Sequence, residues 1–172
     1  MQTVETSRLT LVPFSLDLMK AAIAGKARLG ALLEIAVPAT WPGPDLAEAL
    51  PVFAQNMEKE PEGPVWVGLI IHKTDRMLIG DMGFHGAPDE NGTVEIGYSI
   101  VPEYRNQGYA TEMVKALMHW AFQEPEIKVI TAETLKDNTA SIKVLTKVGM
   151  NCLTSEDKWL KWEMRKQAPE EP

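Results

Sequence analysis

Residues 93–122 read TVEIGYSIVPEYRNQGYATEMVKALMHWAF, which predicts a strand, a short turn around Gly108, and an amphipathic helix. The strand is indicated by β-branched and aromatic residues, and it ends at Pro102 because proline cannot donate to a sheet ladder. The helix is indicated by one apolar stripe with helical spacing, made of Ala110, Met113, Val114, Leu117, Met118 and Ala121. No Gly or Pro interrupts this helix before Pro125.

The turn between these elements, Arg105 to Ala110, has the composition of an anion-binding site. The first backbone N–H groups of a helix have no partner within the helix, and they carry partial positive charge. Small residues at Gly108 and Ala110 would let a diphosphate approach the backbone, and Arg105 adds a fixed positive charge. We therefore expect this turn to bind a ligand that carries phosphate.

Two well-known phosphate-binding loops do not match the chain. It contains no G-x-x-x-x-G-K-[ST], and no G-x-G-x-x-G closes a first strand–helix unit. A dinucleotide-binding domain would also place an acidic residue about twenty positions after a Gly-rich first turn, and none follows here. A different nucleotide-binding domain is therefore a disfavoured alternative.

The composition is that of an ordinary globular domain, with 172 residues of which 45% are hydrophobic and 24% charged. We expect a single domain over residues 1–167 and a disordered tail over residues 168–172. The longest apolar runs, such as residues 65–71, are too short to cross a bilayer, and the polar start lacks a signal peptide. We therefore expect a cytoplasmic protein with no membrane contact.

Charge and cysteine content restrict the partners further. The net charge of −7 argues against a nucleic-acid partner and weakly favours a cationic one, such as an amine. The single cysteine, Cys152, excludes an internal disulfide and suits a reducing compartment. No His, Cys, Asp or Glu residues have metal-ligand spacing, so we expect no metal.

The chain in order predicts a mixed α/β domain whose central sheet is mostly antiparallel and flanked by helices. We expect strands at residues 7–14, 65–72, 77–84, 94–101, 128–135, 150–154 and 158–165. We expect helices at residues 15–24, 26–36, 45–59, 110–121 and 137–149, with Asp45 capping the third and Pro51 bending or splitting it. The fourth and fifth strands are joined through a helix, so they should be parallel neighbours.

The signature [RQ]-x-x-G-x-[GA], filled by Arg105, Gly108 and Ala110 between a strand and a helix, resembles that of the GNAT acetyltransferases. The blocks ETSRLTLVPF, EIGYSIVPEYRNQGYATE and NTASIKVLTKVGM resemble those of its ribosomal-protein N-terminal acetyltransferase branch. The resemblance covers roughly Val4 to Arg165. It implies direct transfer of an acetyl group from acetyl-CoA to a protein N-terminus or a small amine.

The same resemblance assigns residues to the cofactor. It implies that the fourth and fifth strands splay, so that the pantetheine arm pairs with the fourth like an extra strand. The implied backbone and side-chain contacts are Ser99, Ile100 and Val101 for the pantetheine, Arg105, Asn106, Gln107, Gly108, Tyr109 and Ala110 for the pyrophosphate, and Thr111, Asn138 and Ser141 beside them.

Catalytic roles follow with one departure from the family pattern. Many members place a tyrosine acid seven residues after the Asn, but here that position is Leu145, so Ser141 is the implied substitute. Glu95 is our candidate base, and the alternative is an exposed carboxylate that pairs across the sheet. A backbone N–H near Ser99 or Ile100 would hold the oxyanion.

Several alternatives stay open at this point. The missing tyrosine also fits a non-catalytic acyl-CoA-binding sensor. His85 is favoured as a loop cap over an acceptor-site residue, and Trp41 could either line the acceptor pocket or pack under its loop. The terminal strands could pair with a second copy to form a homodimer.

Overall fold

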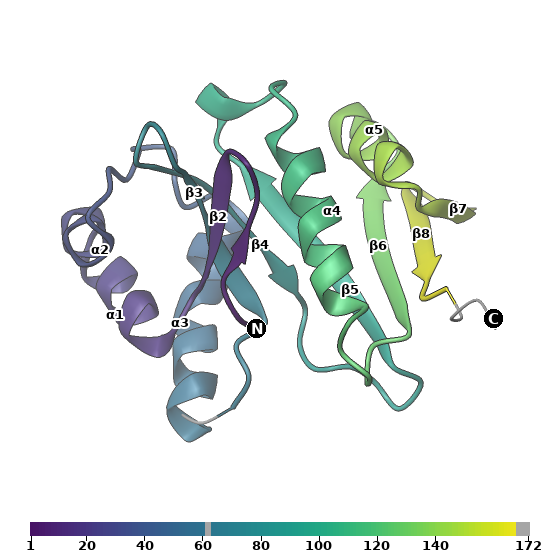
Figure 1. The fold of residues 1–172 in the computed structure, drawn as a ribbon, viewed down its shortest axis with the longest axis horizontal. Helices are drawn as coiled ribbons and strands as arrows, with labels where there is room; N and C mark the ends of the chain where they lie inside the picture. Colours follow the sequence, from purple (N-terminus) through teal and green to yellow (C-terminus); the bar gives the residue numbers. More distant parts are fainter. Residues whose placement is uncertain (61–62, 168–172) are drawn as a thin grey trace.

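The computed structural model describes residues 1–60 and 63–167, which form one eight-stranded sheet with helices around it (Figure 1). Across the sheet the strands follow the order β1 (Val4–Glu5), β2 (Leu9–Pro13), β3 (Val67–His72), β4 (Met77–Phe84), β5 (Thr93–Ile100), β6 (Val129–Leu135), β8 (Trp159–Arg165) and β7 (Asn151–Glu156). All neighbours are antiparallel except β5 and β6. The predicted mixed, mostly antiparallel sheet is confirmed, whereas the predicted disordered tail lies outside the described residues.

The helices begin and end at recognisable cap residues. They are α1 (Leu16–Ala24), α2 (Lys26–Leu33), α3 (Pro44–Lys59), the short 3₁₀ helix η1 (Pro102–Tyr104), α4 (Tyr109–Ala121) and α5 (Thr139–Val148). Ser15 caps α1 by accepting the N–H of Leu18, and Gly149 ends α5 with a left-handed φ of 89°.

One prediction about the first half of the chain was wrong, and one of the two alternatives predicted for Pro51 is excluded. Asp45 does not cap α3; Gly43 is the cap, and Pro44 takes the first helical position, where a missing N–H costs nothing. Pro51 does not split α3, because the buried stripe that includes Leu50 and Ala54 holds both halves against the core.

Where we predicted a single strand over residues 7–14, the structure has two strands, β1 and β2. A two-residue edge strand, β1, pairs with β2 through Val4 and Leu11. Two residues are too few to show a periodic pattern, so the sequence could not reveal this strand.

The parallel pair β5–β6 separates after three residues. Thr93, Val94 and Glu95 pair with residues 129–131. Beyond them, β5 continues to Ile100 and β6 to Leu135, but the two strands no longer pair with each other. Figure 1 shows these two arrows diverging towards the end at which η1 and α5 lie. The predicted splay is therefore present, and it leaves one edge of β5 without a strand partner.

The side chains of β5 alternate between the two faces of the sheet. Tyr98 points to the face that α4 and α5 cover, which we call the α5 face, and its hydroxyl donates to the Ser141 carbonyl at 3.5 Å. Ser99 points to the opposite face, which we call the Trp41 face because the indole of Trp41 packs there beside Asp81.

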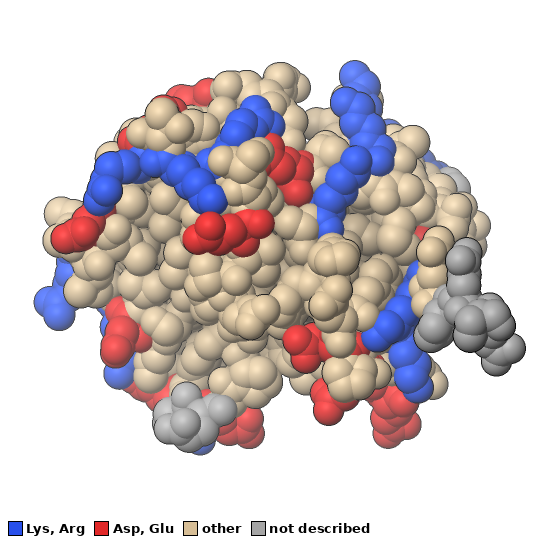
Figure 2. Space-filling model, viewed as in Figure 1, with Lys and Arg blue, Asp and Glu red and all other residues tan. Residues whose placement is uncertain are grey.

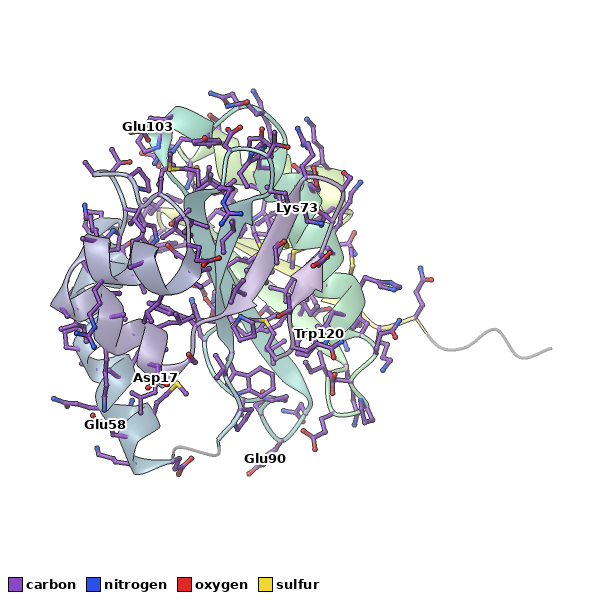
Figure 3. The ribbon with its side chains drawn as sticks, turned by 60° about the vertical axis from the view of Figure 1, so that its left-hand side comes forward. Asp17, Glu58, Lys73, Glu90, Glu103 and Trp120 are labelled. Carbon is purple, nitrogen blue, oxygen red and sulfur yellow. The ribbon has the colours of Figure 1, made fainter. Side chains whose placement is uncertain are left out.

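Figure 3 shows that Glu90, before β5, and Glu103, after it, lie at opposite ends of the molecule. The turn that follows η1 is thus at the carboxyl end of β5, where open α/β sheets bind their ligands. The helix α4 that follows this turn is packed into the core, since its Met113, Val114 and Leu117 are all fully buried. No helix within residues 1–60 and 63–167 has the length and apolar character to span a bilayer.

Candidate active site

The backbone of the turn at residues 105–111 presents a row of unpaired N–H groups. Asn106 and Gly108 both have left-handed φ values, 58° and 81°, and α4 begins directly after Gly108. The six amides from residue 106 to residue 111 donate to no acceptor among the described residues. Because such amides lie at the positive end of α4, the turn can hold an anion.

The side chains of the turn take different directions from its amides. The Nε of Arg105 donates to the Ile100 carbonyl at 2.9 Å, which ties the turn to the end of β5. The Tyr109 side chain is only 7% exposed, and its hydroxyl lies 3.0 Å from Nε2 of His72. Tyr109 can therefore offer a ligand its backbone N–H alone, whereas Asn106, Gln107 and Gly108 are exposed.

Arg8 and Glu112 support the turn from outside, and we did not predict either as a site residue. Nε of Arg8 donates to Oε2 of Glu112 at 2.7 Å, and its Nη1 donates to the Gln107 carbonyl at 3.2 Å. The guanidinium also covers the Tyr109 ring, 4.3 Å from the centroid. A first-turn carboxylate would repel a bound diphosphate, so its pairing with Arg8 matters for the charge at the turn.

Glu112 predicts an acid-sensitive component of stability. Partial burial acts to raise its pKa, but hydrogen bonds from Thr6 and Arg8 together hold the pKa below the ordinary 4.5. Its stabilisation is therefore complete above pH 4.5 and disappears as the pH falls through the folded-state pKa. In Glu112→Gln we expect a loss of about 1.5–3 kcal/mol at pH 7. Thermal melts should show this difference shrinking below pH 4.5; a difference independent of pH would contradict the assignment.

The unpaired edge of β5 exposes the backbone groups of alternate residues. The Val101 N–H donates to the Ile79 carbonyl at 2.8 Å, and the Val101 carbonyl accepts the N–H of Tyr104 at 3.0 Å. Both backbone groups of Val101 are therefore already bonded within the fold, and its contact with pantetheine stays a prediction. Because bonding alternates along an antiparallel ladder, Ser99 also directs its backbone to β4, and Ile100 directs its own to the open edge.

On the other side of the splay, the start of α5 carries the second predicted motif. Oδ1 of Asn138 accepts the Ser141 N–H at 3.1 Å, so Asn138 is the N-cap of α5. Leu145, where many GNAT proteins have tyrosine, is fully buried and carries no proton to donate. The Tyr98 hydroxyl lies beside Ser141 instead; burial raises its pKa, and its hydrogen bond to Ser141 offsets part of this.

Residues of β4 and β5 form cross-strand pairs on the Trp41 face, and several of them are polar. Asp81 lies opposite Ser99 and Gly83 opposite Gly97, and the next residues along are His85 and Glu95. Glu95 is 39% exposed, and its Oε1 lies 3.2 Å from Nδ1 of His85. Our predicted base thus has the cross-sheet partner that its alternative interpretation required.

Charged side chains do not form a large patch of one sign on the face that Figure 2 shows. Figure 2 shows acidic and basic side chains in small separate groups, with wide uncharged areas between them. Within residues 1–60 and 63–167, no three His, Cys, Asp or Glu side chains are grouped to hold a metal ion. Anion binding at this site would therefore depend on the turn amides and nearby arginines.

Residues 8–151 match the acetyltransferase (GNAT) domain family. The chain belongs to the GNAT acetyltransferase family. A GNAT relative from Bacillus subtilis (strain 168), the uncharacterised N-acetyltransferase YjdG, is 34% identical over 150 residues, covering 87% of this chain and 89% of the relative. We therefore describe the protein as an acetyl-CoA-dependent acetyltransferase.

Solved GNAT structures share the fold. The ribosomal-protein-S5-alanine acetyltransferase from Vibrio fischeri is 16% identical, with a TM-score of 0.67 over 95% of this chain and 96% of that one. The microcin C7 self-immunity acetyltransferase MccE, in complex with acetyl-CoA and AMP, is 15% identical, with a TM-score of 0.64 over 93% of each chain. At these identities the likeness establishes the GNAT fold.

Proposed function

We propose that this protein transfers the acetyl group of acetyl-CoA directly to a primary amine, on a protein N-terminus or a small molecule. The observation that carries the proposal is the row of six unpaired amides at residues 106–111, directly beside the unpaired edge of β5. One feature suits a diphosphate and the other an extended amide-bearing arm, so together they fit coenzyme A.

Different residues are assigned to different parts of acetyl-CoA. The amides of residues 106–111 and the Arg105 guanidinium hold the diphosphate, with Thr111 beside them. The Ile100 carbonyl already accepts a hydrogen bond from Nε of Arg105, so its N–H is the backbone group that it offers to acetyl-CoA, and we assign this N–H to the oxyanion. When bound, acetyl-CoA supplies the thioester whose carbonyl carbon the amine attacks.

Two proton transfers are needed. A protonated amine must lose a proton before it can attack, and a carboxylate on the Trp41 face takes this proton, with Glu95 as the candidate that the sequence predicts. The departing thiolate must gain one, and we assign this role to the Ser141 hydroxyl in the first turn of α5. In this proposal the base lies on the Trp41 face of the sheet and the acid on the α5 face.

Asn138 allows the cap and the cofactor contact to be tested separately. Asn138→Asp keeps the capping oxygen but removes the amide donor that would contact pantetheine, so helix stability should be retained. Because one hydrogen bond contributes about 1.4 kcal/mol, we expect coenzyme A affinity to fall about tenfold in calorimetry. In Asn138→Ala the melting temperature should fall as well. Unchanged affinity in both variants would remove Asn138 from the site.

The proposed acceptor class is supported by the ribosomal-protein enzymes among the structural neighbours, one of which is a ribosomal L7/L12 α-N-protein acetyltransferase in complex with coenzyme A. By analogy we propose a free α-amine of a peptide or protein as the first acceptor to try. The net charge of −7 suits a cationic acceptor. A cytoplasmic location and a homodimer remain predictions.

The test is thiol release from acetyl-CoA against a panel of amines that includes peptides with free N-termini, amino acids and polyamines. Turnover with one class supports the transferase and identifies its acceptor. Tight coenzyme A binding without turnover on a broad panel would favour the non-catalytic sensor. Failure to bind coenzyme A at all would overturn the proposal.

A further inference from the structure

Asp81 is a carboxylate in the middle of the sheet, on the Trp41 face of β4. It lies opposite Ser99 in the β4–β5 register, and the Ser99 hydroxyl donates to its Oδ2 at 3.0 Å. The indole N–H of Trp41 donates to the same Oδ2 at 2.9 Å, and Trp41 itself is 1% exposed. A residue from a distant loop is thus buried against one oxygen of this carboxylate.

The second oxygen of Asp81 is left available. Oδ1 accepts no hydrogen bond from the described residues, and Asp81 takes part in none of their ion pairs. The residue is nevertheless partly exposed, so Oδ1 can be reached from outside. A carboxylate held on one oxygen and open on the other is costly in a sheet interior, and such costs concentrate at functional sites.

Glu95 is less well placed than Asp81 for the acetyl carbon. It lies four residues before Ser99, which is about 13 Å along a strand at about 3.3 Å per residue. It also lies where β5 and β6 are still paired, and it shares its carboxylate with His85. Asp81 instead contacts Ser99 itself, next to Ile100, on the part of β5 whose edge is free.

We propose that Asp81, and not Glu95, is the catalytic carboxylate that binds the acceptor ammonium and takes its proton. This inference rests on the proposed function. One ammonium proton passes to Oδ1 of Asp81; the nitrogen lone pair forms the bond to the acetyl carbon as the carbon–sulfur bond breaks. The electron pair leaves with sulfur, which takes a proton from the Ser141 hydroxyl, and the second proton lost from nitrogen passes through solvent to restore that hydroxyl.

The surroundings of Asp81 suit this role. Burial raises its pKa, and the hydrogen bonds from Trp41 and Ser99 counter this only in part. The other titratable residues on the strands around it are Glu95 and Tyr98 on β5 and His72 on β3, and β4 holds no other. The loop that carries Trp41 begins with Glu34, which pairs with Arg76, and Thr40 of that loop donates to the Glu103 carboxylate. The Tyr98 hydroxyl is on the α5 face, and the His72 ring is bound to Tyr109.

The first experiment compares Asp81→Asn with Glu95→Gln, using the best amine from the thiol-release panel, and takes Glu90→Gln in the exposed turn before β5 as the matched charge control. We expect kcat/KM of Asp81→Asn to fall about 10²–10⁴-fold, with coenzyme A affinity unchanged and activity partly restored in Asp81→Glu. Glu95→Gln should lose far less. A greater loss in Glu95→Gln than in Asp81→Asn would overturn the inference.

Stability separates a catalytic from a structural role. Because the folded-state pKa of Asp81 is raised, its ionisation lowers the free energy of unfolding as the pH rises above the ordinary 3.8. Asp81→Asn should therefore melt at the same temperature as the native protein or higher at pH 7, while its activity is lost. A large drop in the melting temperature that matches the loss of activity would identify a structural residue instead.

The second experiment needs no cofactor. The Trp41 indole N–H donates to Asp81, so its proton and nitrogen resonances should titrate in the free protein with a midpoint above the ordinary 3.8. This titration should vanish in Asp81→Asn and persist in Glu95→Gln; persistence in Asp81→Asn would overturn the inference. If the native protein turns over no amine, the proposed function fails, whereas turnover that survives in Asp81→Asn defeats only this inference.

Discussion

Gly108→Trp should abolish measurable coenzyme A binding while the protein remains folded. Gly108, with a left-handed φ of 81°, lies in the middle of the unpaired amides, and only Nη2 of Arg8 lies within 4 Å of an added Cβ, so a larger side chain has room there. An indole there would cover the amides on either side. Losing two charge-assisted hydrogen bonds at about 1.5 kcal/mol each would weaken binding by more than about 100-fold. Calorimetric titration with coenzyme A measures this directly.

Gly108→Ala is the matched control for backbone strain. The nearest atom to an added Cβ is the Nη2 of Arg8 at 3.6 Å, which is ordinary contact, so alanine introduces the positive-φ strain without blocking the turn. Both variants should lose about 1 kcal/mol of stability. Only the tryptophan variant should lose coenzyme A. Native-like affinity in Gly108→Trp would mean that the diphosphate binds elsewhere.

Gly80→Ala should destabilise the centre of the sheet and deform the cofactor edge of β5. An added Cβ would overlap the Ser99 carbonyl oxygen, with the Ile100 Cα only 3.2 Å away. All of these are backbone atoms, so the strand itself must shift. We expect the free energy of unfolding to fall by about 1–3 kcal/mol or more, and coenzyme A affinity to fall with it. Denaturant unfolding and calorimetry on the same sample measure both.

Gly97→Ala tests whether the backbone contact is what matters. Its added Cβ would lie 2.7 Å from Nε2 of His85, which is also too close, but this atom is at the end of a side chain that is 63% exposed. His85 can rotate away, so the change in stability should stay within about 0.5 kcal/mol. Equal losses in the two variants would refute the backbone explanation.

Most features set by neighbouring residues were predicted well from the sequence, although Asp45 is not the cap of α3. The Ser15 cap, the glycine ends of α1 and α5, and the Asn138 cap each depend on a few adjacent residues, and all are present. The strand–turn–helix unit around Gly108 was predicted for the same reason. The splay of β5 and β6 came from the family resemblance and not from any spacing in the chain.

Contacts between distant residues could not be predicted in this way. Arg8 and Glu112 are 104 positions apart, Trp41 and Asp81 are 40 apart, and Tyr98 and Ser141 are 43 apart. No periodicity links such partners, because their meeting depends on strand register and on how α4 and α5 lie across the sheet. Asp81 in particular resembles any other polar residue of a hairpin until Trp41 and Ser99 are seen to converge on it.

The alternation of β5 also restricts how this enzyme can evolve. Tyr98 and Ser99 are adjacent in sequence but point to opposite faces, so a one-residue insertion or deletion upstream in the strand would exchange their faces and remove the contacts with Ser141 and Asp81. Single substitutions in β5 leave the other side chains on their faces, whereas a change of its length by one residue does not. New acceptors should therefore arise by changes in the turn between β4 and β5, where residues can be gained or lost without changing the register within β5.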